Sequence, residues 1–139
     1  MTTIQDCKMI QFPWITRPEG KLTAVHGRSE VPFEIQRVFY LYDLPAGESR
    51  GVHAHRELKQ LLVCIMGSTD VTLDDGRKKK SLTLNRAHQG LIMPNMIWGG
   101  LRNFSSGAVC LILASSPYDE ADYIRDYSEF LQNKGVSTH

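Results

Sequence analysis

Gly47-Glu48-Ser49-Arg50-Gly51-Val52-His53-Ala54-His55 is the most informative stretch of this 139-residue chain. Its two histidines are two positions apart, so on a β-strand both imidazole rings project from the same face. Only the small Ala54 separates them, and apolar runs surround the stretch. Because burying an imidazole without a partner costs free energy, a pair that faces the inside of a small barrel indicates a functional site. The alternative interpretation is a pair of surface histidines on an exposed strand.

Turn-forming residues interrupt the chain at short intervals, and this spacing predicts an all-β fold. Between the breaks we expect about seven to ten strands, each rich in Val, Ile, Leu, Phe or Tyr. Asp74-Asp75-Gly76 predicts a tight hairpin turn, because Gly76 can adopt the positive φ that such a turn requires. The clearest strand candidates are residues 22–25, 36–42, 60–66, 70–73, 80–84, 91–93 and 109–115.

Only the C-terminal part of the chain has the pattern of a helix. Ser116 is a suitable cap and Pro117 suits the first helical position, so we expect the helix to begin near Ser116. Gly135 predicts its end. The apolar residues of this segment recur at helical intervals and should form one stripe that packs on the barrel, namely Tyr123, Ile124, Tyr127, Phe130 and Leu131.

Length, composition and charge indicate one ordinary globular domain over residues 1–139. The 16 Lys and Arg residues nearly balance the 15 Asp and Glu residues, so we expect no nucleic-acid partner and no anionic membrane surface. No apolar run approaches the ~20 residues of a membrane-spanning helix. The first residues lack the pattern of a secretory signal, and the cysteines lack metal-ligand spacing. These features predict a cytoplasmic protein.

The spacing around the paired histidines resembles the first signature of the cupin superfamily, whose members are small jelly-roll barrels. Gln60 stands where that signature places a metal-binding glutamate, and Gly99 stands where a later histidine ligand is expected. The resemblance implies a cupin-type small jelly-roll barrel with a C-terminal α-helix. Since protein sites for divalent iron, manganese or zinc generally use three or more ligands, we expect no metal here. Four residues match the signature: Gly47, His53, His55 and Gly67.

More closely, the chain resembles the sugar nucleotide 3,4-ketoisomerases (WxcM-like), cupin enzymes that act on dTDP-4-keto-6-deoxy-D-glucose. The resemblance covers about residues 20–130 and implies that the ketone moves from carbon 4 to carbon 3 without metal or redox cofactor. The product would be a dTDP-3-keto-6-deoxyhexose, the substrate of a 3-aminotransferase. The matching segments are Pro32-Phe33, Arg37-Val38-Phe39-Tyr40, Arg50-Gly51-Val52-His53-Ala54-His55, Leu73-Asp74-Asp75-Gly76 and Asp119-Glu120-Ala121-Asp122-Tyr123-Ile124-Arg125.

Such an isomerisation needs a base that removes the proton on carbon 3 and an acid that returns a proton to carbon 4 of an enediol. Imidazoles, with an ordinary pKa of ~6.5, suit both tasks. His53 is the candidate base, and His55 is the candidate group that moves a proton between the enediol oxygens; the two assignments can be exchanged. Tyr40 is a third catalytic candidate, although an aromatic residue in an apolar strand is more often part of the core.

Cationic and planar side chains are candidates for substrate binding. Arg37 and Arg50 suit a diphosphate or a developing enolate oxygen, and surface ion pairs are the alternative interpretation for both. Arg17 resembles a family position near the nucleotide. Trp98 suits stacking on thymine, or barrel packing. Gln60, at the position of the missing metal ligand, completes the predicted set.

Two other functions stay open at this stage. A related 3,5-epimerase on the same substrate also abstracts a proton beside the ketone. It is disfavoured because its chemistry usually relies on a His-Asp dyad, and no aspartate is evident near His53. A sugar-binding cupin without catalysis is the other alternative. Exposed strand edges favour a homodimer, and the resemblance implies exchanged N-terminal strands.

Overall fold

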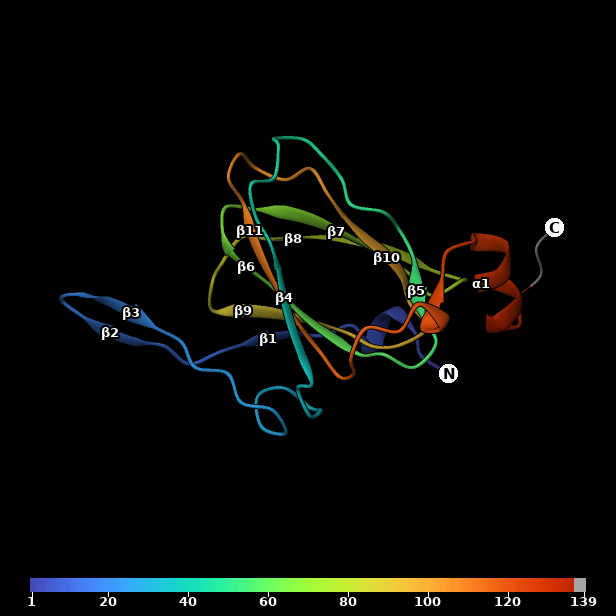
Figure 1. Cartoon of the computed structure of the whole chain (residues 1–139), viewed down its shortest axis with the longest axis horizontal. Helices are drawn as coiled ribbons and strands as arrows, with labels where there is room; N and C mark the ends of the chain where they lie inside the picture. Colours follow the sequence, from blue (N-terminus) through green and yellow to red (C-terminus); the bar gives the residue numbers. More distant parts are fainter. Residues whose placement is uncertain (137–139) are drawn as a thin grey trace.

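Two antiparallel sheets pack face to face around an apolar core in the computed structural model, which describes residues 1–136 (Figure 1). The larger sheet has the order β1-β9-β6-β11-β4, with the bounds Met9–Gln11, Gln89–Met93, Gln60–Met66, Val109–Ala114 and Arg37–Leu41. The smaller sheet has the order β10-β7-β8, with the bounds Trp98–Arg102, Thr69–Asp74 and Lys79–Leu84. The chain is therefore an all-β, cupin-type jelly roll, and the predicted fold class is confirmed.

Short elements complete the fold. A hairpin of β2 (Ile15–Arg17) and β3 (Gly20–Leu22) projects from the body as an arm (Figure 1). β5 (Ala54–His55) pairs with β12 (Tyr123–Ile124) beside the open end of the sheets. The helical elements are two 3-10 turns, η1 (Ile4–Asp6) and η2 (Glu120–Asp122), and α1 (Tyr127–Lys134). None of the helices in residues 1–136 is long and apolar enough to span a bilayer.

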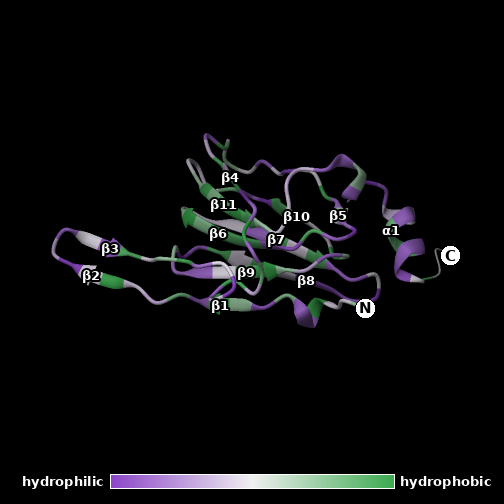
Figure 2. Cartoon of the chain, turned by 60° about the horizontal axis from the view of Figure 1, so that its bottom comes forward, coloured by the Kyte–Doolittle hydropathy of each residue, from purple (hydrophilic) through white to green (hydrophobic). Residues whose placement is uncertain are grey.

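The central strand β6 is apolar on both of its faces. Leu62 and Cys64 point into the core between the two sheets, where they belong to one cluster with Val71 and Leu73 of the smaller sheet. Leu61 and Val63 point the other way and pack under the segment that precedes β4, against Phe12, Val31 and Phe33. Figure 2 shows the resulting hydrophobic colouring of β6 and β11. Burial on both faces explains why this strand is a continuous apolar run rather than an alternating one.

The predicted hairpin at Asp74-Asp75-Gly76 is confirmed. β7 and β8 pair in register from Thr69 with Leu84 to Asp74 with Lys79, and Gly76 adopts a φ of 94°. The Asp75 carboxylate accepts hydrogen bonds from the backbone N–H groups of Arg77 and Lys78, at 2.9 and 2.8 Å. The turn is thus stabilised by its own side chain as well as by glycine.

Six of the seven strand candidates contain a strand of the structure, and the one over residues 22–25 does not. There β3 ends at Leu22, and the chain crosses the outer face of the larger sheet without pairing. The strands missed by the pattern are β1, β2, β3, β5, β10 and β12, which are two to five residues long. Such short strands carry too few residues for a periodic signal.

The C-terminal helix begins later than predicted. α1 starts at Tyr127, where the Asp126 carboxylate caps it by accepting the N–H of Glu129 at 3.1 Å, so the expected start near Ser116 is wrong. The intervening residues form η2 and β12, and pairing of β12 with β5 uses backbone groups that a longer helix would bond internally. The predicted end is confirmed, because Gly135 adopts a φ of 75°.

Phe130 fastens this C-terminal segment to the barrel, since it is fully buried in a cluster with Ala54 and Ile124. We expect Phe130→Ala to lower the free energy of unfolding by about 3–5 kcal/mol, the usual cost of removing a buried ring. Urea unfolding monitored by circular dichroism measures the change. Gln132→Ala, an exposed site on the same helix, serves as the control and should change stability by less than about 0.5 kcal/mol. Equal stability of the two variants would contradict the proposed anchoring.

Candidate active site

A cavity of about 270 Å³ opens between the two sheets at the end where β5 and β12 lie. Its inner wall is apolar, with Phe39, Leu62, Met93 and Ile112 among the lining residues. Its polar wall brings together five of the eight predicted site residues, namely Arg37, Arg50, His53, His55 and Gln60. Tyr123 and Arg125 line the same wall and were not among the predicted residues.

The two histidine rings stand side by side in this wall. Their centroids are 4.9 Å apart and the rings meet edge to face at 85°. Ala54, between them, points the other way and packs on Ile124 and Phe130, as strand alternation requires. His53 is held by reciprocal backbone hydrogen bonds with Gly99, at 3.2 and 3.0 Å. A side chain at Gly99 would place its Cβ 2.5 Å from the carbonyl oxygen of Thr72, so the close strand contact requires glycine.

Both imidazoles are neutral at neutral pH. Burial lowers the pKa of His53 below its ordinary value, against a hydrogen bond with the Gly51 carbonyl that favours the charged form. Burial lowers the pKa of His55 further, to about 4, and the neighbouring His53 adds to the effect. Neutral rings have a free lone pair, so each can accept a proton from a bound molecule.

An aspartate lies against His55. Asp122 Oδ2 is 3.1 Å from His55 Nδ1, and both side chains are largely buried. The same carboxylate accepts the backbone N–H groups of Glu57 and Leu58, at 2.8 and 3.2 Å. The sequence shows no aspartate near the histidines because Asp122 follows His55 by 67 positions. Its segment was also expected to be helical, which hid the pairing of β12 with β5 that brings it here.

Tyr123 and Arg125 extend the wall beyond the histidines. The Tyr123 ring lies 4.9 Å from the His53 ring and 4.4 Å from the His55 ring. The Arg125 guanidinium covers the other side of Tyr123 at 4.3 Å and forms two hydrogen bonds with Glu120, at 2.8 and 2.9 Å. Its charge is therefore partly compensated within the chain.

Arg37 is differently placed. Its guanidinium lies over the Phe39 ring at 4.4 Å, and its buried Nη1 has no hydrogen-bond partner among the described residues. Arg50 reaches the same cavity from the loop before β5. Because buried donors are almost always satisfied in folded proteins, the orphaned Nη1 indicates an acceptor on a bound ligand.

Three predicted site residues do not line this cavity of the single chain. Tyr40 is 59% exposed on the outer face of β4, because its neighbours Phe39 and Leu41 take the inward positions. Trp98 packs on Tyr127 and Phe130, at ring distances of 5.3 and 5.7 Å, since the next residue of β10 is the one that faces the cavity. Arg17 is exposed on the arm.

The cavity does not offer the donor set of a cupin metal site. Gln60 and Gly99 both line it, at the positions where the cupin signature expects a glutamate and a histidine. Residues 1–136 contain no cluster of three or more His, Cys, Asp or Glu side chains placed to hold a metal ion. Two imidazoles and an amide are a poor ligand set for divalent iron, manganese or zinc.

Comparisons with known proteins give one consistent family. The family model FdtA (WxcM-like, C-terminal) matches residues 5–135. The TDP-4-oxo-6-deoxy-α-D-glucose-3,4-oxoisomerase of Aneurinibacillus thermoaerophilus is 43% identical over 123 residues, 88% of each chain. The WlaRB TDP-quinovose 3,4-ketoisomerase from Campylobacter jejuni is 43% identical, with a TM-score of 0.90 over 93% of this chain and 99% of that one. QdtA, a sugar 3,4-ketoisomerase from Thermoanaerobacterium thermosaccharolyticum solved in complex with TDP, is 34% identical, with a TM-score of 0.92 over 96% of this chain and 97% of that one.

The neutral state of His55 makes stability depend on pH. An unfolded His55 has an ordinary pKa of ~6.5, so between about pH 6.5 and 4 the unfolded chain takes up a proton that the folded chain excludes. We expect the free energy of unfolding to fall across this window by up to about 3 kcal/mol. Urea titrations at pH 7, 6 and 5 measure the slope. His55→Gln should flatten it, and an unchanged slope in that variant would contradict the assignment.

Proposed function

This chain belongs to the FdtA (WxcM-like, C-terminal) family and is a TDP-sugar 3,4-ketoisomerase, and from that premise we propose its substrate and mechanism. The proposed substrate is dTDP-4-keto-6-deoxy-D-glucose, and the product is a dTDP-3-keto-6-deoxyhexose formed through an enediol without a metal. The observation that carries this proposal is the pair of neutral imidazoles 4.9 Å apart in the wall of one cavity.

The size and lining of the cavity support a keto sugar as the occupant. Its volume of about 270 Å³ lies at the lower end of ligand pockets, so it suits one hexose ring and leaves the nucleotide outside. The apolar inner wall of Phe39, Leu62 and Met93 suits the methyl group of a 6-deoxy sugar. Arg50, at the exposed rim, is placed to meet the diphosphate.

The first step is removal of the proton on carbon 3, which the adjacent ketone makes acidic. His53 accepts that proton on its free lone pair, the C–H electron pair forms a double bond between carbons 3 and 4, and the carbonyl oxygen at carbon 4 becomes a negatively charged enolate oxygen. The buried Nη1 of Arg37 is suited to hold this oxygen while it carries negative charge. Gln60 offers an amide hydrogen bond to a sugar hydroxyl.

The second step completes the isomerisation without any change in the number of electrons. The hydroxyl proton at carbon 3 leaves as the new ketone forms, and carbon 4 receives a proton from the imidazolium. In this proposal His55 moves the hydroxyl proton between the two oxygens, a role that the closeness of its ring to that of His53 supports. The net result is a hydrogen moved from carbon 3 to carbon 4 and a hydroxyl proton moved from the oxygen on carbon 3 to the oxygen on carbon 4.

A 3,5-epimerase is the second candidate, and one observation favours it. The contact between His55 and Asp122 is a His-Asp pair of the kind that reaction uses, although the carboxylate lies against His55 and not against His53. Membership of the ketoisomerase family outweighs it. The two reactions differ in the position of the ketone in the product, which is carbon 4 for an epimerase and carbon 3 for a ketoisomerase.

Proton NMR of the chain mixed with dTDP-4-keto-6-deoxy-D-glucose tests the reaction directly. We expect a 3-keto product, at the same rate with and without EDTA. His53→Asn should lower kcat by about 10²–10⁴-fold, the usual contribution of a general base. The control His26→Asn, an exposed histidine far from the cavity, should keep the wild-type rate. Titration calorimetry should give His53→Asn a wild-type Kd for dTDP, because the nucleotide binds through other groups.

The outcomes separate the alternatives. A product that keeps its ketone at carbon 4 would identify an epimerase. Tight binding of dTDP with an unchanged substrate spectrum would identify a binding protein. Loss of dTDP affinity in His53→Asn would show that this histidine binds the nucleotide instead of acting as the base.

The cytoplasm is the proposed compartment. Cys7, Cys64 and Cys110 are all buried free thiols, and Cys64 and Cys110 stay unbonded although they lie opposite each other on β6 and β11. Free thiols so placed suit a reducing environment.

A homodimer with exchanged arms is also proposed. The arm exposes Trp14, Ile15 and Leu22, which are 48%, 50% and 58% accessible. An apolar groove on the outer face of the larger sheet is lined by Val38 and Ile65 and, at the base of the chain's own arm, by Trp14 and Lys21, and it offers a surface for the arm of a second copy. In such a dimer Arg17 would reach the partner.

Analytical ultracentrifugation tests this assembly. We expect a mass of twice 15.7 kDa for the wild type. Ile15→Asp should shift the chain toward the monomer, because it places a charge in the proposed contact. A monomeric wild type at micromolar concentration would contradict the exchanged dimer.

A further inference from the structure

We infer that Asp122 is a positioning residue that fixes the tautomer of His55, so that Nδ1 carries the hydrogen and Nε2 is the proton acceptor toward the cavity. This inference rests on the proposed function and adds to it the protonation state in which His55 acts. It also separates His53 from His55, since of these two only His55 has a carboxylate partner among the described residues.

The hydrogen-bond chemistry of the contact determines the tautomer. An ionised carboxylate can only accept hydrogen bonds, so the nitrogen 3.1 Å from Asp122 Oδ2 must be the one that donates. A neutral imidazole has one N–H group, and once Nδ1 carries it, Nε2 has the lone pair. His55 lines the cavity and its Nδ1 side is occupied, so Nε2 is the nitrogen available to a bound sugar.

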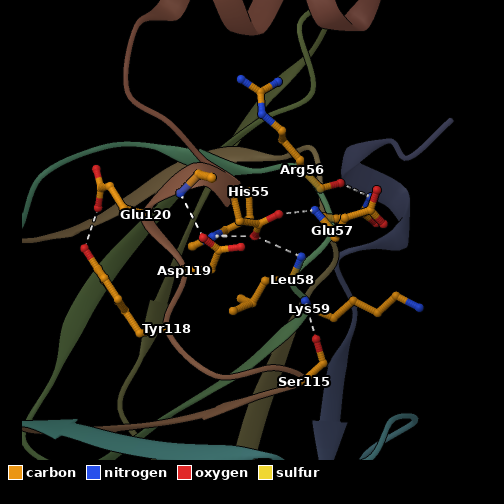
Figure 3. Close-up of polar contacts among 12 residues, drawn as sticks. His55, Arg56, Glu57, Leu58, Lys59, Ser115, Tyr118, Asp119 and Glu120 are labelled. Carbon is orange, nitrogen blue, oxygen red and sulfur yellow. Dashed lines mark hydrogen bonds and ion pairs between the residues drawn. The ribbon is translucent and has the colours of Figure 1, made fainter.

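The carboxylate is held firmly enough to impose this state. Its Oδ1 accepts the N–H of Glu57 and its Oδ2 also accepts the N–H of Leu58. Figure 3 shows these two residues following His55 along the chain. The Asp122 carbonyl accepts the N–H of Arg56 at 2.9 Å. The next residue, Tyr123, pairs with His55 itself in the β12–β5 ladder. Rotation of the carboxylate would break at least two of these bonds at once.

The same contact stabilises the cation that forms during a proton shuttle. When Nε2 accepts a proton, the positive charge of His55 develops beside His53 and in the field of Arg37, and both oppose it. Asp122 is the group that favours the charged ring. A transient imidazolium can therefore form and release its proton again, which suits a group that returns to its starting state in every turnover.

The wild-type chain gives the first test. In ¹⁵N-labelled protein at pH 7, a long-range ¹H–¹⁵N spectrum, with His55 assigned from its absence in His55→Gln, reports which ring nitrogen carries hydrogen. We expect protonated Nδ1 and unprotonated Nε2 for His55. Protonated Nε2 would overturn the inference. This readout needs no substrate, so it stands even if the chain forms no 3-keto product, an outcome that would instead refute the proposed function.

Asp122→Asn gives the second test, because an amide has only one acceptor oxygen for the donors that the carboxylate serves. Replacing the carboxylate that orients a catalytic imidazole lowers the rate by up to about 10⁴-fold in serine hydrolases. We expect kcat to fall by about 10²–10⁴-fold here, with the Kd for dTDP within about threefold of wild type. The matched control is Asp119→Asn. The native Asp119 caps Ala121 in the same turn without touching a histidine, so this variant should keep the wild-type kcat.

The variants also have to separate positioning from folding. Binding of dTDP and the thermal midpoint report whether Asp122→Asn is folded, and Asp122→Glu, which restores the carboxylate, should recover part of the lost kcat. A folded Asp122→Asn with wild-type kcat would overturn the inference. If that variant does not fold, the tautomer of the wild-type ring still decides the question.

Discussion

The pairing of two very short strands, β5 and β12, is the contact on which the site depends. β5 has only two residues, and one of them is His55. Its ladder partner β12 comes from the last quarter of the chain and is secured by Ile124 and Phe130, which pack on the back of Ala54. The core contact and the histidine contact are thus opposite faces of the same strand. Packing of the C-terminal segment on the barrel therefore also forms the cavity wall that holds the histidines.

The loss of hydration on burial keeps these two imidazoles neutral, which is the state that their proposed chemistry requires. The same loss of hydration opposes folding. Exclusion of water keeps the two imidazoles uncharged, and their separation of only 4.9 Å and the nearby arginines add to this effect. The neighbouring Asp122 only partly offsets that penalty. A surface pair of histidines would be easier to accommodate and would titrate near pH 6.5, but it would share its lone pairs with water.

The sequence pattern predicted the features that depend only on residues close together in the chain. The shared face of His53 and His55, the β7–β8 turn and the end of α1 at Gly135 all follow from residues within a few positions of one another. Asp122 and Tyr123 reach the site through a pairing across 67 residues, which no local period reports. Tyr40 and Trp98 show a different limit: each is one position out of phase with the residue that faces inward. Which residues of a strand face inward depends on its register with the neighbouring strands.

Gly99 limits the substitutions that this fold can accept in the cavity wall. Its missing side chain lets β10 lie against β7 so closely that any Cβ would meet the Thr72 carbonyl at 2.5 Å. On this backbone, a third imidazole at that position requires the two strands to separate and the backbone bonds to His53 to shift with them. A single substitution at Gly99 therefore cannot turn this cavity into a three-imidazole metal site while β10 and β7 keep their present spacing.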